Sequence, residues 1–222
     1  MASEALSFDV GAETVSALID VPGKARAAYV LAHGAGAGMA HPFLEKVASG
    51  LAERGIATFR YQFPYMEKKS RRPDSPKVAE AAVRAAVIEA ARHFRQLPLI
   101  AGGKSFGGRM TSGAQAAEPL PGVVGLAFLG FPLHAPGKPS DERAGHLAAV
   151  KIPMLFLQGT RDNFADLTLL RPLVKRLGTR ATLHLVDDGD HSFHVRKSSG
   201  RGDAEVMTEL LDALAGWIDS II

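Results

Sequence analysis

The stretch LPLIAGGKSFGGRM, residues 97–110, decides how this chain is interpreted. Gly103-Lys104-Ser105 is how a nucleotide-binding phosphate loop ends, with the lysine on phosphate and the serine on magnesium. Gly103-Lys104-Ser105-Phe106-Gly107 also has the G-x-S-x-G form of a turn that presents a serine nucleophile between a strand and a helix. In that second interpretation Ser105 is the attacking group and Lys104 is nearly incidental.

The spacing excludes the phosphate loop. The pattern G-x-x-x-x-G-K-[ST] requires a glycine five residues before Gly103, and that position is Pro98. The apolar strand runs straight to Gly102, which leaves no loop to surround a phosphate group. We therefore expect Lys104 to matter least among the residues of this stretch.

The order strand, G-x-S-x-G and helix fits a nucleophile turn. Gly103 and Gly107 lie two residues on either side of Ser105, where side chains facing each other across a sharp turn would clash. A helix that opens with Gly107-Gly108 gives up about 1 kcal/mol per glycine relative to alanine. A requirement other than helix stability therefore favours these glycines, and we predict Ser105 as the nucleophile.

The rest of the chain repeats a strand pattern followed by a helix pattern. Such alternation, with strands apolar on both faces, predicts an α/β three-layer sandwich: a mostly parallel, doubly wound sheet with helices on both faces. No repeat, linker or domain boundary is visible, so we predict a single domain spanning residues 1–222. The expected strands are 5–10, 14–20, 27–33, 56–62, 97–102, 123–131, 153–159 and 181–187, and the expected helices are 42–54, 77–96, the segment after Ser105 to about 117, one between the last two strands, and one from about 203.

A serine nucleophile needs a base, and the base needs a carboxylate to orient it. In a sheet of this kind the chain order is serine, acid, histidine, each after its own strand. Asp162 follows the strand at 153–159, and His191 follows the strand at 181–187. Both residues are where the order requires them.

Each partner has a competitor nearby. His194 lies three residues beyond His191, where the chain has begun to leave the sheet edge. Asp166 competes with Asp162 but is better suited to the start of the following helix, where a carboxylate favours the helix dipole. We favour His191 and Asp162.

The loop Gly34-Ala35-Gly36-Ala37-Gly38 follows the strand at 27–33, and its small residues would let backbone N–H groups approach a substrate. We predict an oxyanion hole made by the amides of Phe106 and Ala35, with Gly36 as the alternative to Ala35. His33 is expected to brace this loop.

A metal site is the remaining alternative near His191. Carboxylates and imidazoles gather in residues 187–194, but no second cluster of ligands occurs elsewhere. We therefore expect no metal and no cofactor.

Composition narrows the function classes further. The 222 residues include no cysteine, which excludes disulfides and a cysteine nucleophile. The N-terminus lacks a signal-peptide pattern and no apolar run could span a bilayer, so a cytoplasmic location without membrane association is expected. The net charge is +3 and the only dense basic cluster lies at 67–74, within a proline-punctuated loop expected to be solvated. Nothing predicts nucleic-acid binding.

Together, HGAGAG, GKSFGG, GTRD and DGDHSF, in this order at successive strand ends, resemble the α/β-hydrolase family over nearly the whole chain. FRYQFPYM, GFPLHAPGKP, QGTRDNF and GDHSF also resemble small bacterial α/β-hydrolases of unassigned substrate, broadly like dienelactone hydrolase in size. The resemblance implies a Ser105–Asp162–His191 triad and esterase-like hydrolysis of a small acyl substrate.

The segment between 131 and 153 is too short for a large cap, so we expect an accessible site rimmed by loops 62–76 and 132–140. The alternative is a non-catalytic interaction domain built on the same fold. The sequence does not indicate the substrate or the oligomeric state.

Overall fold

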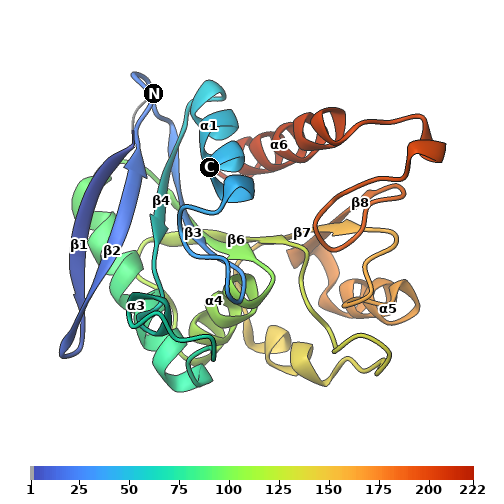
Figure 1. Ribbon diagram of the computed structural model, residues 1–222, viewed down its shortest axis with the longest axis horizontal. Coiled ribbons are helices and arrows are strands. Elements are labelled where there is room, and N and C mark those ends of the chain that lie inside the picture. The colour runs from blue at the N-terminus through green and yellow to red at the C-terminus, as the bar shows by residue number, and fades with distance from the viewer. Residues whose placement is uncertain (1–2) are drawn as a thin grey trace.

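The computed structural model describes residues 3–222 and contains one sheet of eight strands in the order β1-β2-β4-β3-β5-β6-β7-β8 (Figure 1). All eight strands lie at segments expected from the hydrophobic pattern. The strands are β1 (Glu4–Val10), β2 (Glu13–Asp20), β3 (Ala27–Ala32), β4 (Ile56–Tyr61), β5 (Leu99–Lys104), β6 (Val123–Leu129), β7 (Met154–Gly159) and β8 (Ala181–Val186).

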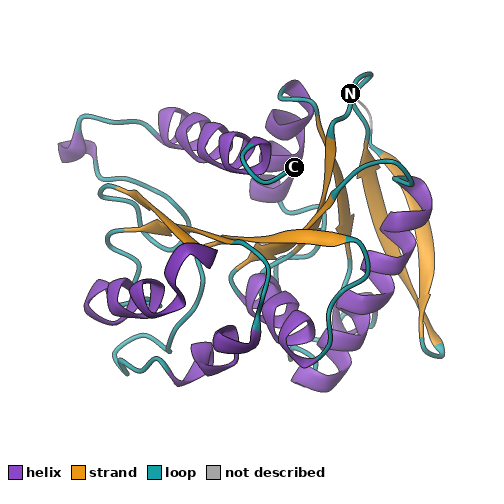
Figure 2. Cartoon of the chain, turned by 180° about the vertical axis from the view of Figure 1, so that it is seen from behind, coloured by secondary structure: helices purple, strands orange, loops and turns teal. Residues whose placement is uncertain are grey.

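Helices cover both faces of this sheet, which confirms the predicted fold class. Helices α1 and α6 lie on one face, and α3, α4 and α5 lie on the other (Figures 1 and 2). The helical segments are α1 (Pro42–Glu53), α2 (Pro64–Glu67), α3 (Pro76–His93), α4 (Phe106–Ala117), η1 (Glu142–Ala149), α5 (Leu167–Leu177), η2 (Gly178–Arg180), η3 (Lys197–Ser199) and α6 (Asp203–Asp219).

The sheet is parallel from β4 through β8 and antiparallel at its N-terminal edge. β1 pairs with β2, and β2 pairs with β4, both antiparallel. Every residue of β3, β4 and β7 is buried, as expected for strands covered by helices on both sides. Because the strands from β3 to β8 run in one direction, the loops that follow them meet along a single edge.

Three helical segments, α2, η1 and η3, fall in regions expected to be loops. The four residues of α2 are too few to show a helical period in sequence. The segment η1 buries Ala144 and Leu147 against the same core as α3 to α5. Within residues 3–222, η1 is the sole helical element between β6 and β7, so no large cap covers this part of the fold.

Over residues 3–222, the structure contains no helix with the length and apolar character needed to cross a bilayer.

Candidate active site

Ser105 occupies the turn between β5 and α4. Its backbone angles are φ 49° and ψ −115°, which a residue with a side chain rarely adopts. Such a conformation costs on the order of 1–3 kcal/mol and persists where the surrounding structure holds it. The strain places the Ser105 hydroxyl at the sheet edge, facing the loops that follow β7 and β8.

The glycines around Ser105 are required by the close approach of β3. A Cβ on Gly103 would lie 2.2 Å from the carbonyl oxygen of Ala32, and one on Gly107 would lie 2.6 Å from that of His33. The sequence argument placed the clash between the two glycines themselves. The structure corrects this explanation, because the space is needed by the neighbouring strand and the residue after it.

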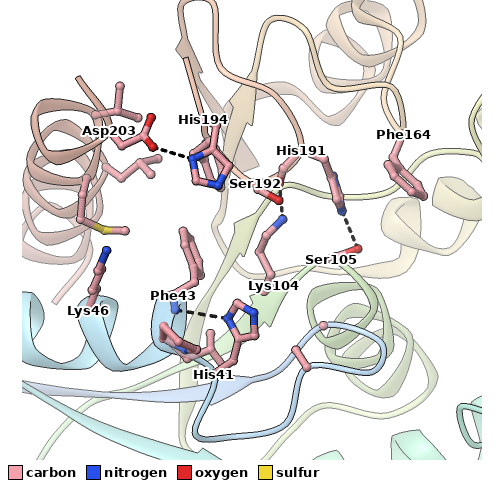
Figure 3. A pocket seen from close by; sticks show the side chains of 18 of the residues that line it. His41, Phe43, Lys46, Lys104, Ser105, Phe164, His191, Ser192, His194 and Asp203 are labelled. Atoms are coloured by element: carbon pink, nitrogen blue, oxygen red, sulfur yellow. Dashed lines mark hydrogen bonds and ion pairs between the residues drawn. The ribbon is translucent and has the colours of Figure 1, made fainter. Parts of the chain in front are cut away.

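Ser105, His191 and Asp162 form a continuous chain of hydrogen bonds. The Nε2 atom of His191 lies 2.9 Å from the Oγ atom of Ser105, and its Nδ1 atom lies 2.7 Å from an Oδ atom of Asp162. In Figure 3 the His191 ring points directly at Ser105. The Asp162 side chain is fully buried, with 0% exposed. Because a carboxylate accepts a hydrogen bond from Nδ1–H, the proton of the neutral ring stays on Nδ1, and Nε2 is free to accept the hydroxyl proton.

Two further groups hold Asp162, and sequence reasoning missed both. The side-chain amide of Gln158 donates to the same oxygen that contacts His191, and the Phe164 N–H donates to the other at 2.8 Å. Gln158 is itself held by the Phe131 N–H, which donates to its side-chain oxygen at 2.9 Å. A glutamine inside the otherwise apolar strand β7 was the available sequence signal.

Both competitors have other partners. Asp166 caps α5 and accepts the Thr168 N–H at 2.8 Å, which is the role expected for it. His194 is exposed and its Nδ1 lies 2.6 Å from a carboxylate oxygen of Asp203. The structure therefore joins His191 and Asp162 to Ser105, and joins neither competitor to it.

The glycine loop after β3 offers two uncommitted backbone donors. Within residues 3–222, the N–H groups of Ala35 and Phe106 donate to no protein acceptor. The N–H of Gly36 donates to the Tyr65 hydroxyl at 2.8 Å, so this alternative donor is already engaged. Ala35 and Phe106 thus remain the donors predicted for an oxyanion.

His33 braces this loop, as expected. Its Nδ1–H donates to the Gly34 carbonyl at 2.7 Å, and its Nε2 accepts the Phe63 N–H at 3.2 Å. Burial lowers the pKa of His33 to about 4, so the ring is neutral at neutral pH.

The carboxylates near His191 are occupied by protein groups. Asp188 pairs with Arg161 and Arg196, and Asp190 accepts the N–H groups of Ser192 and His194. Across the described residues 3–222, no three His, Cys, Asp or Glu side chains converge as a metal site would require.

A cavity of about 810 Å³ is lined by Ser105 and by residues from the N-terminal parts of α1 and α6. The loops 62–76 and 132–140 contribute no lining residue, so the expectation that they rim the site was wrong. Tyr65, in α2, instead supports the glycine loop, because its hydroxyl accepts the Gly36 N–H. The cavity wall is mostly apolar and includes Ala35, Phe43, Phe164, Phe193, Met207 and Leu210.

Lys104 also lines this cavity, although the sequence suggested that it matters least in its stretch. Its ammonium group donates a hydrogen bond to the backbone carbonyl of His191. It also lies 5.9 Å and 5.4 Å from the ring centroids of Phe43 and Phe193. Lys104 therefore connects the nucleophile turn to the histidine segment, a contact between residues far apart in the chain.

The parallel sheet covered by helices, with Ser105, His191 and Asp162 at its carboxyl edge, is the arrangement of an α/β hydrolase. Comparison with known protein families gives the same class. The family model described as an alpha/beta hydrolase domain matches residues 25–219. The chain belongs to this family.

Solved structures with the same fold cover almost the whole chain. A dienelactone hydrolase from Anabaena variabilis superposes with a TM-score of 0.79 at 20% identity, covering 100% of this chain and 98% of that one. An α/β serine hydrolase without a lid, from Xanthomonas campestris, gives 0.76 at 21% identity, covering 97% and 94%. An α/β serine hydrolase homologue from Coxiella burnetii gives 0.77 at 18% identity, covering 97% of each chain. At these identities the likeness concerns the fold.

Proposed function

We propose that this hydrolase is a serine esterase that cleaves a small carboxylic ester, or a related acyl substrate, through an acyl-enzyme. The observation that carries the proposal is the hydrogen-bonded chain from Ser105 through His191 to buried Asp162, at the mouth of an open cavity. Nucleophile, base and orienting carboxylate stand in the order that acyl transfer requires.

In the first step the Ser105 oxygen attacks the ester carbonyl carbon while Nε2 of His191 takes the hydroxyl proton. Asp162 holds the imidazole in the tautomer that leaves Nε2 unprotonated, and it stabilises the imidazolium that forms. The bond to the leaving alcohol then breaks, and the imidazolium returns its proton to that alcohol. An acyl group remains on Ser105.

In the second step water attacks the acyl group, with His191 again accepting a proton and then returning it to the Ser105 oxygen. The products are a carboxylic acid and the free enzyme. The negative charge on the carbonyl oxygen in both steps is placed near the N–H groups of Phe106 and Ala35. Each such donor is worth roughly 3–4 kcal/mol in the transition state.

The cavity suggests the general shape of the substrate. Its walls are largely apolar and it is open to solvent, without a covering cap in residues 3–222. Such a site suits a compact acyl group with an apolar portion lying between α1 and α6.

A fluorophosphonate probe and a p-nitrophenyl ester series test the proposal. Wild-type protein should be labelled, Ser105→Ala should not, and His191→Ala should lose at least about 10³-fold in kcat. His194→Ala is the matched control and should keep its turnover, because His194 contacts Asp203 rather than Ser105. A wild-type protein that neither reacts with the probe nor turns over any ester would favour the non-catalytic interaction domain instead.

A further inference from the structure

We propose that Lys104 is a positioning residue for His191: by holding the backbone of His191, its ammonium group aims the imidazole at Ser105. This inference rests on the proposed function, since it concerns the activation of the same serine. It also reverses the expectation from sequence that Lys104 is dispensable.

The first argument is how the His191 segment is held. Within residues 3–222, the hydrogen bond from the Lys104 ammonium to the His191 carbonyl is the sole one made by the His191 backbone. The flanking residues are tied among themselves, since the Phe193 N–H donates to the Asp190 carbonyl at 3.0 Å. Without Lys104, the backbone that carries the imidazole would have no direct link to the turn that carries the nucleophile.

The second argument is that the lysine is confined. Its ammonium group lies beside the rings of Phe43 and Phe193, which stack on each other with centroids 5.9 Å apart. In Figure 3 the side chain extends from the turn of Ser105 toward the His191 segment. The side chain therefore bridges the two segments in a fixed path.

The third argument is the space reserved for this contact. Gly130, with φ 73°, lies where a Cβ would come 2.9 Å from the Lys104 ammonium and 3.4 Å from the His191 carbonyl oxygen. A side chain at this position would displace the lysine or the histidine backbone. Glycine, which the positive φ also favours, leaves room for both groups.

The fourth argument is that the charge has no ionic partner. Within residues 3–222, no salt bridge includes the half-buried Lys104, although charges partly withdrawn from water are ordinarily paired. A cationic donor makes a stronger hydrogen bond to a carbonyl than a neutral donor does. The charge is therefore explained by the strength with which it holds His191.

The test compares Lys104→Met, which keeps the apolar stem but donates nothing, with Lys104→Arg, which keeps a cationic donor. Lys77→Met is the control, because Lys77 is exposed on α3. Three quantities are measured: the rate at which a neutral fluorophosphonate labels Ser105, the kinetics of a neutral and an anionic p-nitrophenyl ester of matched length, and the melting temperature.

We expect Lys104→Met to label about 10- to 100-fold more slowly, because a small misplacement of a base has effects of this size. The kcat of both esters should fall by the same factor with KM little changed, the melting temperature should not fall, and Lys104→Arg should retain more activity. Three outcomes would each overturn the proposal. They are labelling of Lys104→Met at the wild-type rate, equal losses of activity in Lys104→Met and Lys104→Arg, and a loss confined to the KM of the anionic ester. Failure of the proposed function would look different, because wild-type protein would then not be labelled at all.

Discussion

Replacing Lys104 by methionine should stabilise the folded protein while it slows the reaction. Burial lowers the pKa of Lys104 from 10.5 to about 8, an effect that Asp162 and Asp190 only partly offset. One pKa unit corresponds to about 1.36 kcal/mol, so keeping Lys104 charged costs the folded state at most about 3 kcal/mol. Partial exposure of the side chain screens the charge, and the His191 carbonyl loses a donor. We therefore expect a net gain of about 1–2 kcal/mol for Lys104→Met.

The sign and the pH window follow from the direction of the pKa change. The unfolded chain holds the lysine proton up to about pH 10.5, whereas the folded chain releases it from about pH 8. The cost is therefore fully present below pH 8 and disappears as the pH rises toward 10.5. The variant should have a larger free energy of unfolding than the wild type at pH 7, and this difference should shrink between pH 8 and 10.

Urea unfolding at pH 7.0 and 9.5, with calorimetry at pH 7.0, measures this difference. For a chain of this length a gain of 1–2 kcal/mol raises the melting temperature by roughly 2–8 °C. The titratable or charged groups that act on Lys104 or line its cavity are Asp162, Asp190, His191, His41, Lys46, His194 and Asp203. They are present in both proteins, so the difference between the two curves isolates Lys104. A variant less stable than wild type at pH 7, or a lead that does not change with pH, would refute the reasoning.

Three further predictions concern substitutions elsewhere in the chain. Gln158→Leu should lower kcat in the ester assay about 10-fold, because buried Asp162 loses a hydrogen-bond donor. The control is Gln115→Leu, which replaces a buried glutamine in α4 and should affect stability but not kcat. Gly103→Ala should lower stability by about 3 kcal/mol or more, since its Cβ would overlap a backbone carbonyl, and urea unfolding or loss of soluble expression measures this. Asp166→Ala should keep its turnover while Asp162→Ala loses most of it; the reverse result would exchange their roles.

Sequence reasoning predicted the sheet and the meeting of Ser105, Asp162 and His191 for the same physical reason. Buried parallel strands are recognisable as apolar runs, and their carboxyl ends must lie along one edge, so residues following different strands become neighbours. The cap role of Asp166 is equally local and was also predicted, whereas the approach of β3 that requires Gly103 was not.

Contacts that depend on the path of a long side chain could not be predicted in this way. Lys104 reaches a carbonyl 87 residues later in the chain, and nothing in its neighbours specifies that direction. In the sequence, Gln158 indicates only that a polar group is buried in β7. Its hydrogen-bond partners, Asp162 and the Phe131 N–H, depend on how the loops after β7 and β6 are placed. The prediction of the cavity rim was wrong because the rim depends on where α1 and α6 begin, which the pattern of strands does not determine.

The order of the site residues along the chain has a consequence for biosynthesis. In the proposed mechanism Ser105 gains its base only when His191, 86 residues later, has been added and β8 has joined the sheet next to β7. A nascent chain that lacks this part therefore carries Ser105 without the proposed base. The proposed function therefore predicts that Ser105 becomes reactive only when the C-terminal part of the fold is complete, so that labelling of Ser105 would report whether that part has assembled.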